Sequence, residues 1–132
     1  MGNILANITE IILLLFLTIT FLQSGIDKIL DWNGNVSWLK GHFKDTFLGK
    51  MVPLSVGIIL VIEVISGICT LIGCYELAFT ENNTIALTGT ILSCVTLLML
   101  LFGQRLAKDY EGAKTIAVYF VPAIFLLFLL SN

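Results

Sequence analysis

One acidic residue lies in the middle of a long apolar segment, and it is the residue of this sequence best suited to do chemistry. Glu63 stands within residues 51–75, MVPLSVGIILVIEVISGICTLIGCY. This segment can cross a hydrocarbon core of about 30 Å as a helix that rises about 1.5 Å per residue. A carboxyl at the centre of a membrane helix costs about 2.5–3.5 kcal/mol, so we expect Glu63 to have polar partners.

A polar stripe in the first apolar segment supplies candidate partners. Its members are spaced i, i+3, i+4, i+7 and i+11, so they share one helix face and should face protein rather than lipid. The stripe consists of Thr20, Gln23, Ser24, Asp27 and Asp31. We predict a polar intramembrane cluster that binds the polar head of a membrane-soluble ligand. Its residues are Thr20, Gln23, Asp27, Lys28 and Glu63.

Counting residues from the ends of the apolar segments predicts the depth of each side chain. With Leu30 and Val52 at the same membrane boundary, Glu63 lies about 16 Å deep and level with Thr20. By the same count Lys28 lies about 13 Å from Glu63 along the helix axis. We therefore expect no cation beside the carboxyl.

Two interpretations of Glu63 follow. In the first, the carboxyl is neutral at pH 7 and holds the helices together through hydrogen bonds to Thr20, Gln23 or a hydroxyl of the third segment, because removal from water favours the uncharged acid. In the second, Glu63 binds the polar head of a membrane-soluble ligand or passes a proton, as intramembrane acids often do. The sequence leaves both open.

Other reactive residues are few. The three cysteines all lie in apolar segments without a Cys-x-x-Cys pair, and His42 is the only histidine. From this small set we predict that the chain has no catalytic residue, no metal site and no intrinsic cofactor. We therefore expect any electron carrier to come from another protein, and we expect no nucleic-acid partner.

Four apolar segments must position these residues. Hydrophobic residues make up 58% of the 132 residues and charged residues 12%, and the mean hydropathy is +1.00. This composition predicts one all-α domain over residues 1–132, a membrane-spanning four-helix bundle. The expected spans cover residues 9–30, 52–75, 84–102 and 115–130. Residues 76–83, with Glu76 and Glu81, are expected to form a short loop.

The connection between the first two spans has a helical pattern of its own. The Asn-Gly-Asn sequence at residues 33–35 predicts a turn. Apolar residues then recur at every fourth position, which predicts a short amphipathic helix lying in the membrane interface. They are Leu39, Phe43, Phe47 and Met51.

The positions of the basic residues predict an orientation. All seven Lys and Arg residues lie in, or at the edge of, residues 31–51 and 103–114. The positive-inside rule places both of these connections in the cytoplasm and both termini outside. We expect a multi-pass protein of a bacterial inner membrane.

Two segments together resemble a known family. FLQSGIDKIL in the first span and EVISGICTLIGC in the second, with four spans overall, resemble the DoxX-like membrane proteins. Some members of that family are subunits of quinone-linked oxidoreductases, including thiosulfate:quinone oxidoreductase. The resemblance singles out Gly25, Lys28, Glu63, Gly67 and Gly73.

Three functions are consistent with these observations. The chain is expected to be a non-catalytic accessory subunit of a quinone-linked membrane redox complex, with the polar cluster holding a quinone or a lipid. The alternatives are a small proton-coupled transporter that uses Glu63, and a structural scaffold subunit. The expected partners are membrane lipid and either other membrane-protein subunits or further copies of the chain.

Overall fold

The computed structural model describes residues 2–131, and every regular element among them is a helix. In chain order the elements are α1 (Gly2–Ala6), α2 (Ile8–Leu30), α3 (Trp32–His42), the 3-10 helix η1 (Phe47–Met51), α4 (Val52–Phe79), α5 (Thr84–Leu106) and α6 (Tyr110–Ser131). Four helical segments are long and apolar enough to cross a membrane. They are Ile8–Leu30, Phe47–Phe79, Thr84–Leu106 and Tyr110–Ser131. The predicted all-α fold with four spans is confirmed.

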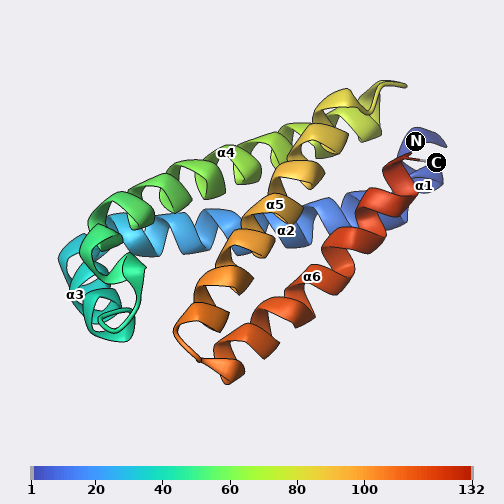
Figure 1. Ribbon diagram of the computed structural model, residues 1–132. Helices are drawn as coiled ribbons and strands as arrows, with labels where there is room; N and C mark the ends of the chain where they lie inside the picture. The colour runs from blue at the N-terminus through green and yellow to red at the C-terminus, as the bar shows by residue number, and fades with distance from the viewer. Residues whose placement is uncertain (1, 132) are drawn as a thin grey trace.

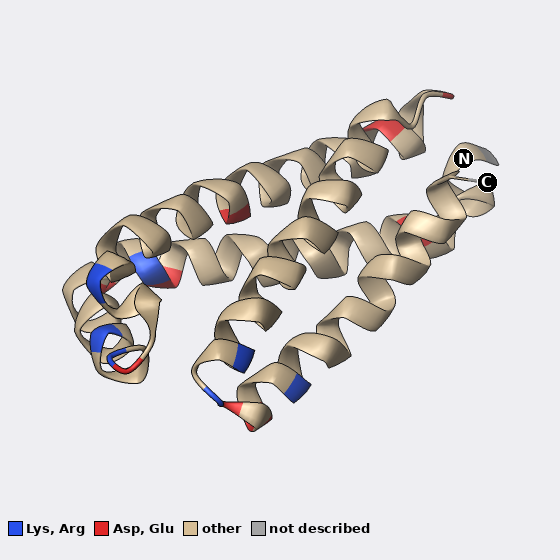
Figure 2. Cartoon of the chain, viewed as in Figure 1, with Lys and Arg blue, Asp and Glu red and all other residues tan. Residues whose placement is uncertain are grey.

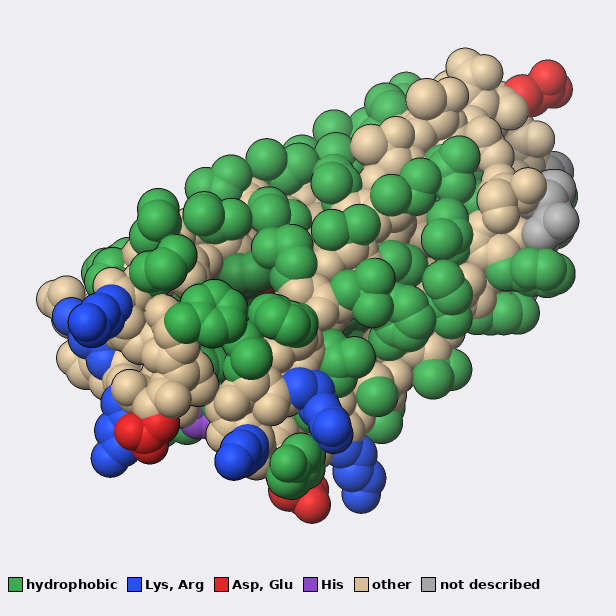
Figure 3. All heavy atoms as spheres, in the orientation of Figure 1, with side chains coloured by type: hydrophobic (Ala, Val, Ile, Leu, Met, Phe, Trp, Pro, Cys, Tyr) green, Lys and Arg blue, Asp and Glu red, His purple; other side chains and the backbone are tan. Residues whose placement is uncertain are grey.

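The four long helices form two antiparallel pairs (Figure 1). α2 and α4 lie side by side, and the α5–α6 hairpin crosses them obliquely, with α5 packed on α4. α1 and the last turns of α6 lie at one end, whereas α3 and the α5–α6 turn lie at the other. Lys and Arg residues gather at this second end (Figure 2). Hydrophobic side chains cover the middle of the face seen in Figure 3, as a membrane environment requires.

Small residues allow α2 and α4 to approach closely. A Cβ added at Gly67 would lie 2.6 Å from the Leu22 side chain, and one added at Gly25 would lie 3.0 Å from Val64. On the same interface, the hydroxyls of Thr18 and Thr70 lie 2.8 Å apart and share a hydrogen bond. Close contact between small residues is how membrane helices gain packing energy without a hydrophobic driving force.

Small residues also allow α4 and α5 to approach closely. A Cβ added at Gly73 would lie 2.7 Å from the Ala86 Cα, and one added at Gly89 would lie 2.9 Å from the Thr70 backbone nitrogen. Backbone therefore lies against backbone on this side of α4, and any larger residue would separate the two helices.

The expected loop over residues 76–83 is wrong in its first half, because α4 continues to Phe79. Glu76 is buried, and its carboxylate accepts the backbone N–H groups of Ile85 and Ala86 at 3.0 and 3.1 Å. These donors lie in the first turn of α5, where the helix provides no partners of its own. Glu76 therefore caps α5 and fixes the α4–α5 turn.

The first connection also differs from its prediction. Residues 33–35 lie inside α3 instead of forming a turn, since the Asp31 side chain accepts the Gly34 N–H and starts the helix there. The helix ends at His42, so it contains only Leu39, the first of the four predicted apolar positions. Leu39 and Phe43 pack against the cluster of Val36, Val52 and Val56, whereas Phe47 is 64% exposed.

Candidate ligand-binding site

An ion pair between Lys28 and Glu63 links α2 to α4. The Lys28 Nζ lies 3.2 Å from each carboxylate oxygen of Glu63 and 2.7 Å from the Ser24 hydroxyl. Ser24 and Lys28 are one helical turn apart and therefore lie on the same face of α2. The Glu63 side chain is 1% exposed and that of Lys28 is 17% exposed. The pair thus combines a fully buried carboxylate with a cation that is only partly covered.

The expectation that no cation lies beside Glu63 is wrong, because the register between the helices differs from the one assumed. With Leu30 level with Val52, Thr18 would have faced residue 64; it pairs with Thr70 instead. The six-residue difference moves Glu63 about 9 Å along the axis toward Lys28. The physical reason is that α4 begins beyond the end of α2, where α3 packs beside its first turn.

The structure brings together two of the five predicted cluster residues, Lys28 and Glu63. The Thr20 hydroxyl donates to the Phe16 backbone carbonyl at 2.8 Å, and Gln23 and Asp27 are exposed. The partner of Glu63 is therefore a cation, not the hydroxyl or amide expected of a neutral acid.

The predicted cluster omitted Ser24, a residue of the polar stripe in the first span whose hydroxyl contacts Lys28. Ser24 stands four residues before Lys28, and this spacing was the available signal that its hydroxyl could hold the ammonium. One turn beyond Glu63, the Ser66 hydroxyl is fully buried and has no hydrogen-bond partner within residues 2–131.

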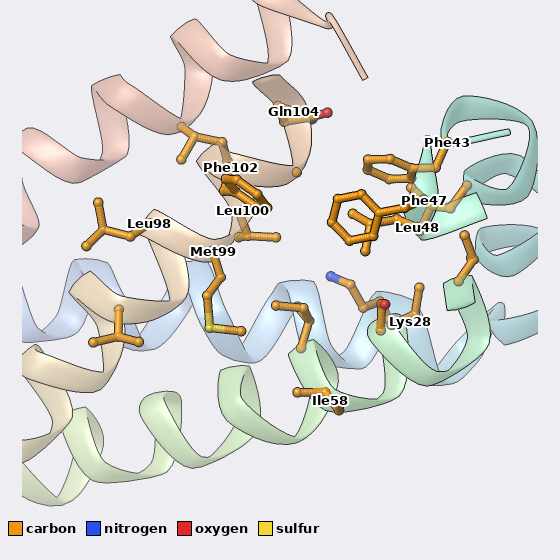
Figure 4. A pocket seen from close by; sticks show the side chains of 18 residues that line it. Lys28, Phe43, Phe47, Leu48, Ile58, Leu98, Met99, Leu100, Phe102 and Gln104 are labelled. Carbon is orange, nitrogen blue, oxygen red and sulfur yellow. The ribbon is translucent and has the colours of Figure 1, made fainter. Parts of the chain in front are cut away.

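A cavity of about 570 Å³ lies beside the ion pair, and Lys28 forms part of its wall. The lining residues are apolar except for Lys28, Ser55 and Gln104. Figure 4 shows the Lys28 side chain pointing into the space between Phe47 and Leu100. Among the described residues, the cavity therefore has a single cationic group and a mainly apolar lining.

Faces of α4 and α5 and the first connection build most of the cavity wall, and α2 and α6 contribute Lys28 and Ile116. The α5 face has the spacing i, i+3, i+4, i+7 and i+8, and the α4 face has i, i+3, i+4 and i+7, so each is one side of a helix. They consist of Val95, Leu98, Met99, Phe102 and Gly103 on α5 and of Val52, Ser55, Val56 and Ile59 on α4. From Val95 to Gln104 the α5 wall extends about 14 Å, which suits a molecule with a head and a tail.

His42 joins two connections at the edge of the cavity. Its Nε2 lies 2.9 Å from the Gln104 side-chain oxygen and 3.5 Å from an Asp109 carboxylate oxygen. The ring stacks on Trp38 and meets Phe43 edge-on. The end of α3 is thereby tied to the α5–α6 turn. This contact could not be predicted from the sequence, since His42 lies more than 60 residues before Gln104 and Asp109.

The comparisons with known proteins give no relative for this chain. No protein-family model matches it, and neither does any curated protein or solved structure. The resemblance to the DoxX-like family therefore stays a prediction. Within residues 2–131 no group of three or more His, Cys, Asp or Glu side chains is placed to hold a metal ion.

Proposed function

We propose that this protein binds an amphipathic, membrane-soluble molecule, a quinone or a lipid, with the polar head at Lys28 and the apolar part in the neighbouring cavity. The observation that supports this most directly is the cavity itself, whose volume of about 570 Å³ lies in the range of small-molecule sites. Such sites are mainly apolar and carry a few polar groups that orient the ligand, as Lys28 and Ser55 would here.

In this proposal the chain is a non-catalytic accessory subunit of a quinone-linked membrane complex, and a partner subunit supplies the redox centre. The protein belongs to a bacterial inner membrane, with both termini outside and residues 31–51 and 103–114 in the cytoplasm. The gathering of Lys and Arg at the end with α3 and the α5–α6 turn supports this orientation (Figure 2). The cavity then opens near the cytoplasmic headgroups.

The binding function can be tested by identifying what remains bound after purification. Quinones and lipids are extracted from the detergent-purified protein and quantified by mass spectrometry. The variant Leu98→Trp fills the cavity, and Ile91→Trp is the matched control, because both residues are about half exposed on α5 but only Leu98 lines the cavity.

We expect near-stoichiometric retention of one quinone or lipid species by the wild type and by Ile91→Trp, and at least a tenfold loss by Leu98→Trp. Equal retention by both variants, or no species above the detergent background, would contradict the binding function. The accessory role is checked separately by cross-linking in native membranes followed by affinity purification, which should recover an oxidoreductase subunit.

A structural role is the second candidate, and the ion pair between α2 and α4 favours it. A scaffold subunit would need Lys28 and Glu63 only to join its helices. It would retain its partner subunits in the Leu98→Trp variant while binding no particular quinone or lipid.

A further inference from the structure

The electrostatics of the Lys28 site restrict the kind of head that it accepts. Within residues 2–131, Lys28 is the only charged residue in the cavity wall, and both carboxylate oxygens of Glu63 lie 3.2 Å from its Nζ. The positive charge is therefore already neutralised from the side away from the cavity. An anionic head that reached Lys28 would also lie close to the Glu63 carboxylate, in surroundings where little water screens the repulsion.

The hydrogen-bond geometry leaves one donor for a ligand. An ammonium has three N–H groups, and Ser24 accepts one of them at 2.7 Å. The two oxygens of one carboxylate, each 3.2 Å away, subtend only about 40° at Nζ. Because two N–H bonds of an ammonium diverge by far more than this, the straightest geometry has a single N–H directed between both oxygens. The third N–H remains for the cavity into which Lys28 points (Figure 4).

A second donor lies on the same wall. The Ser55 hydroxyl lines the cavity from α4 and makes no hydrogen bond to another residue in the described part of the chain. It lies on the cavity-facing side of α4 with Val52 and Ile59, eight residues or about 12 Å along the helix axis before Glu63. Lys28 and Ser55 thus offer hydrogen-bond donors without offering net charge.

We infer that the cavity selects an uncharged head with a hydrogen-bond-accepting carbonyl, such as that of a quinone, a ketone or an ester, over a carboxylate, a phosphate or an amine. This inference rests on the proposed binding function and specifies its ligand. A carbonyl accepts the free N–H of Lys28 without meeting repulsion from Glu63. An amine would instead add a cation beside Lys28.

The inference is tested with three photoreactive probes that share one tail of twelve carbons carrying a diazirine and differ only in the head: a methyl ketone, a carboxylate and a primary amine. The protein is irradiated with each probe in nanodiscs of a neutral lipid at pH 8. Labelled residues are then mapped by mass spectrometry. For the wild type we expect the ketone to label cavity residues such as Met99 at least tenfold more than either charged probe.

Two variants test whether the Glu63 carboxylate causes the preference for an uncharged head. Glu63→Gln removes the neutralising carboxylate, so the carboxylate probe should then label the cavity more than the ketone does. Ser55→Ala keeps the ion pair, and it should lower ketone labelling severalfold without changing the order of the probes. Circular dichroism and size-exclusion chromatography establish which variants fold. If Glu63→Gln does not fold, the order of the probes in the wild type still tests the inference.

The outcomes distinguish the preference for an uncharged head from the binding function itself. Cavity labelling by the carboxylate or the amine that equals or exceeds ketone labelling in the wild type overturns the inference and leaves the binding function in place. An unchanged order of the probes in folded Glu63→Gln overturns the electrostatic explanation. The absence of cavity labelling with all three probes overturns the proposed binding function as well.

Discussion

Lys28 and Glu63 are 35 positions apart in the sequence, and the Lys28 ammonium lies at equal distances of 3.2 Å from the two Glu63 oxygens. The ion pair joins the last turns of α2 to the middle of α4. Its carboxylate is buried while its ammonium reaches a cavity, so the same contact connects helix packing with ligand binding. Removing one partner should therefore lower the free energy of unfolding more than replacing both partners by apolar residues does.

The first prediction concerns this asymmetry. Lys28→Met leaves the buried Glu63 carboxylate without a cation and should lower the free energy of unfolding by about 3–5 kcal/mol. The double variant Lys28→Met with Glu63→Leu replaces the pair by apolar side chains and should recover most of that loss. Reversible unfolding of the purified variants in mixed micelles measures both values.

A double-mutant cycle with Glu63→Leu alone completes this experiment. A coupling energy between the two positions near zero would mean that no ion pair forms in the membrane. In that case the neutral carboxyl expected from the sequence would again be the better description of Glu63.

The second prediction concerns the register between α2 and α4. Cysteines at positions 18 and 70, in a chain whose three native cysteines are replaced by alanine, should form a disulfide on mild oxidation, because the Thr18 and Thr70 hydroxyls lie 2.8 Å apart. Cysteines at positions 20 and 63 should remain reduced, since this pair is level only in the register assumed from the sequence. Electrophoretic mobility with and without reductant distinguishes them, and the reverse result would restore the assumed register.

The four spans could be predicted because each contains enough apolar residues to cross a bilayer, and this signal depends on composition alone. The partner of Glu63 could not be predicted, because counting residues for depth assumed that the end of the first span at Leu30 is level with the start of the second at Val52. α4 begins beyond the end of α2, where α3 packs against Val52 and Val56. The periodicity of apolar residues in the sequence does not predict this displacement along the helix axis.

The cavity was also beyond sequence reasoning, since its walls come from all four long helices and the first connection. Leu98 and Phe102 carry the spacing of any lipid-facing stripe, and only the fold shows that they line a cavity. Lys28 and Glu63 could be recognised individually, because a charge in an apolar segment is costly wherever it lies. Whether they would meet was a question of register.

The third prediction uses the close approach of α4 and α5. A methyl group at Gly73 would lie 2.7 Å from the Ala86 Cα, and backbone cannot move aside as a side chain can. We expect Gly73→Ala to lower the free energy of unfolding by about 1–3 kcal/mol. Gly41→Ala in α3 is the control, because no atom lies within 4 Å of its added Cβ, and it should be neutral or stabilising by up to about 1 kcal/mol. Equal effects in micelle unfolding would argue against this helix contact.

The fourth prediction compares two buried hydroxyls on α4. Thr70→Val loses the hydrogen bond to Thr18 and should cost about 0.5–1.5 kcal/mol in the free energy of unfolding. Ser66→Ala removes a buried hydroxyl that has no partner within residues 2–131, so it should leave stability unchanged or raise it. The same unfolding assay measures both variants. A larger loss for Ser66→Ala than for Thr70→Val would show that the Ser66 hydroxyl has a partner in the membrane.

The last prediction concerns orientation, because the side on which the cavity opens depends on it. Single cysteines are placed at the exposed positions of Lys44, in the first connection, and Glu81, between α4 and α5, in the chain without native cysteines. The positive-inside rule predicts that a membrane-impermeant maleimide labels position 81 in intact cells and labels position 44 only after permeabilisation. Labelling of position 44 but not of position 81 in intact cells would reverse the orientation, and the ligand would then reach Lys28 from the outer leaflet.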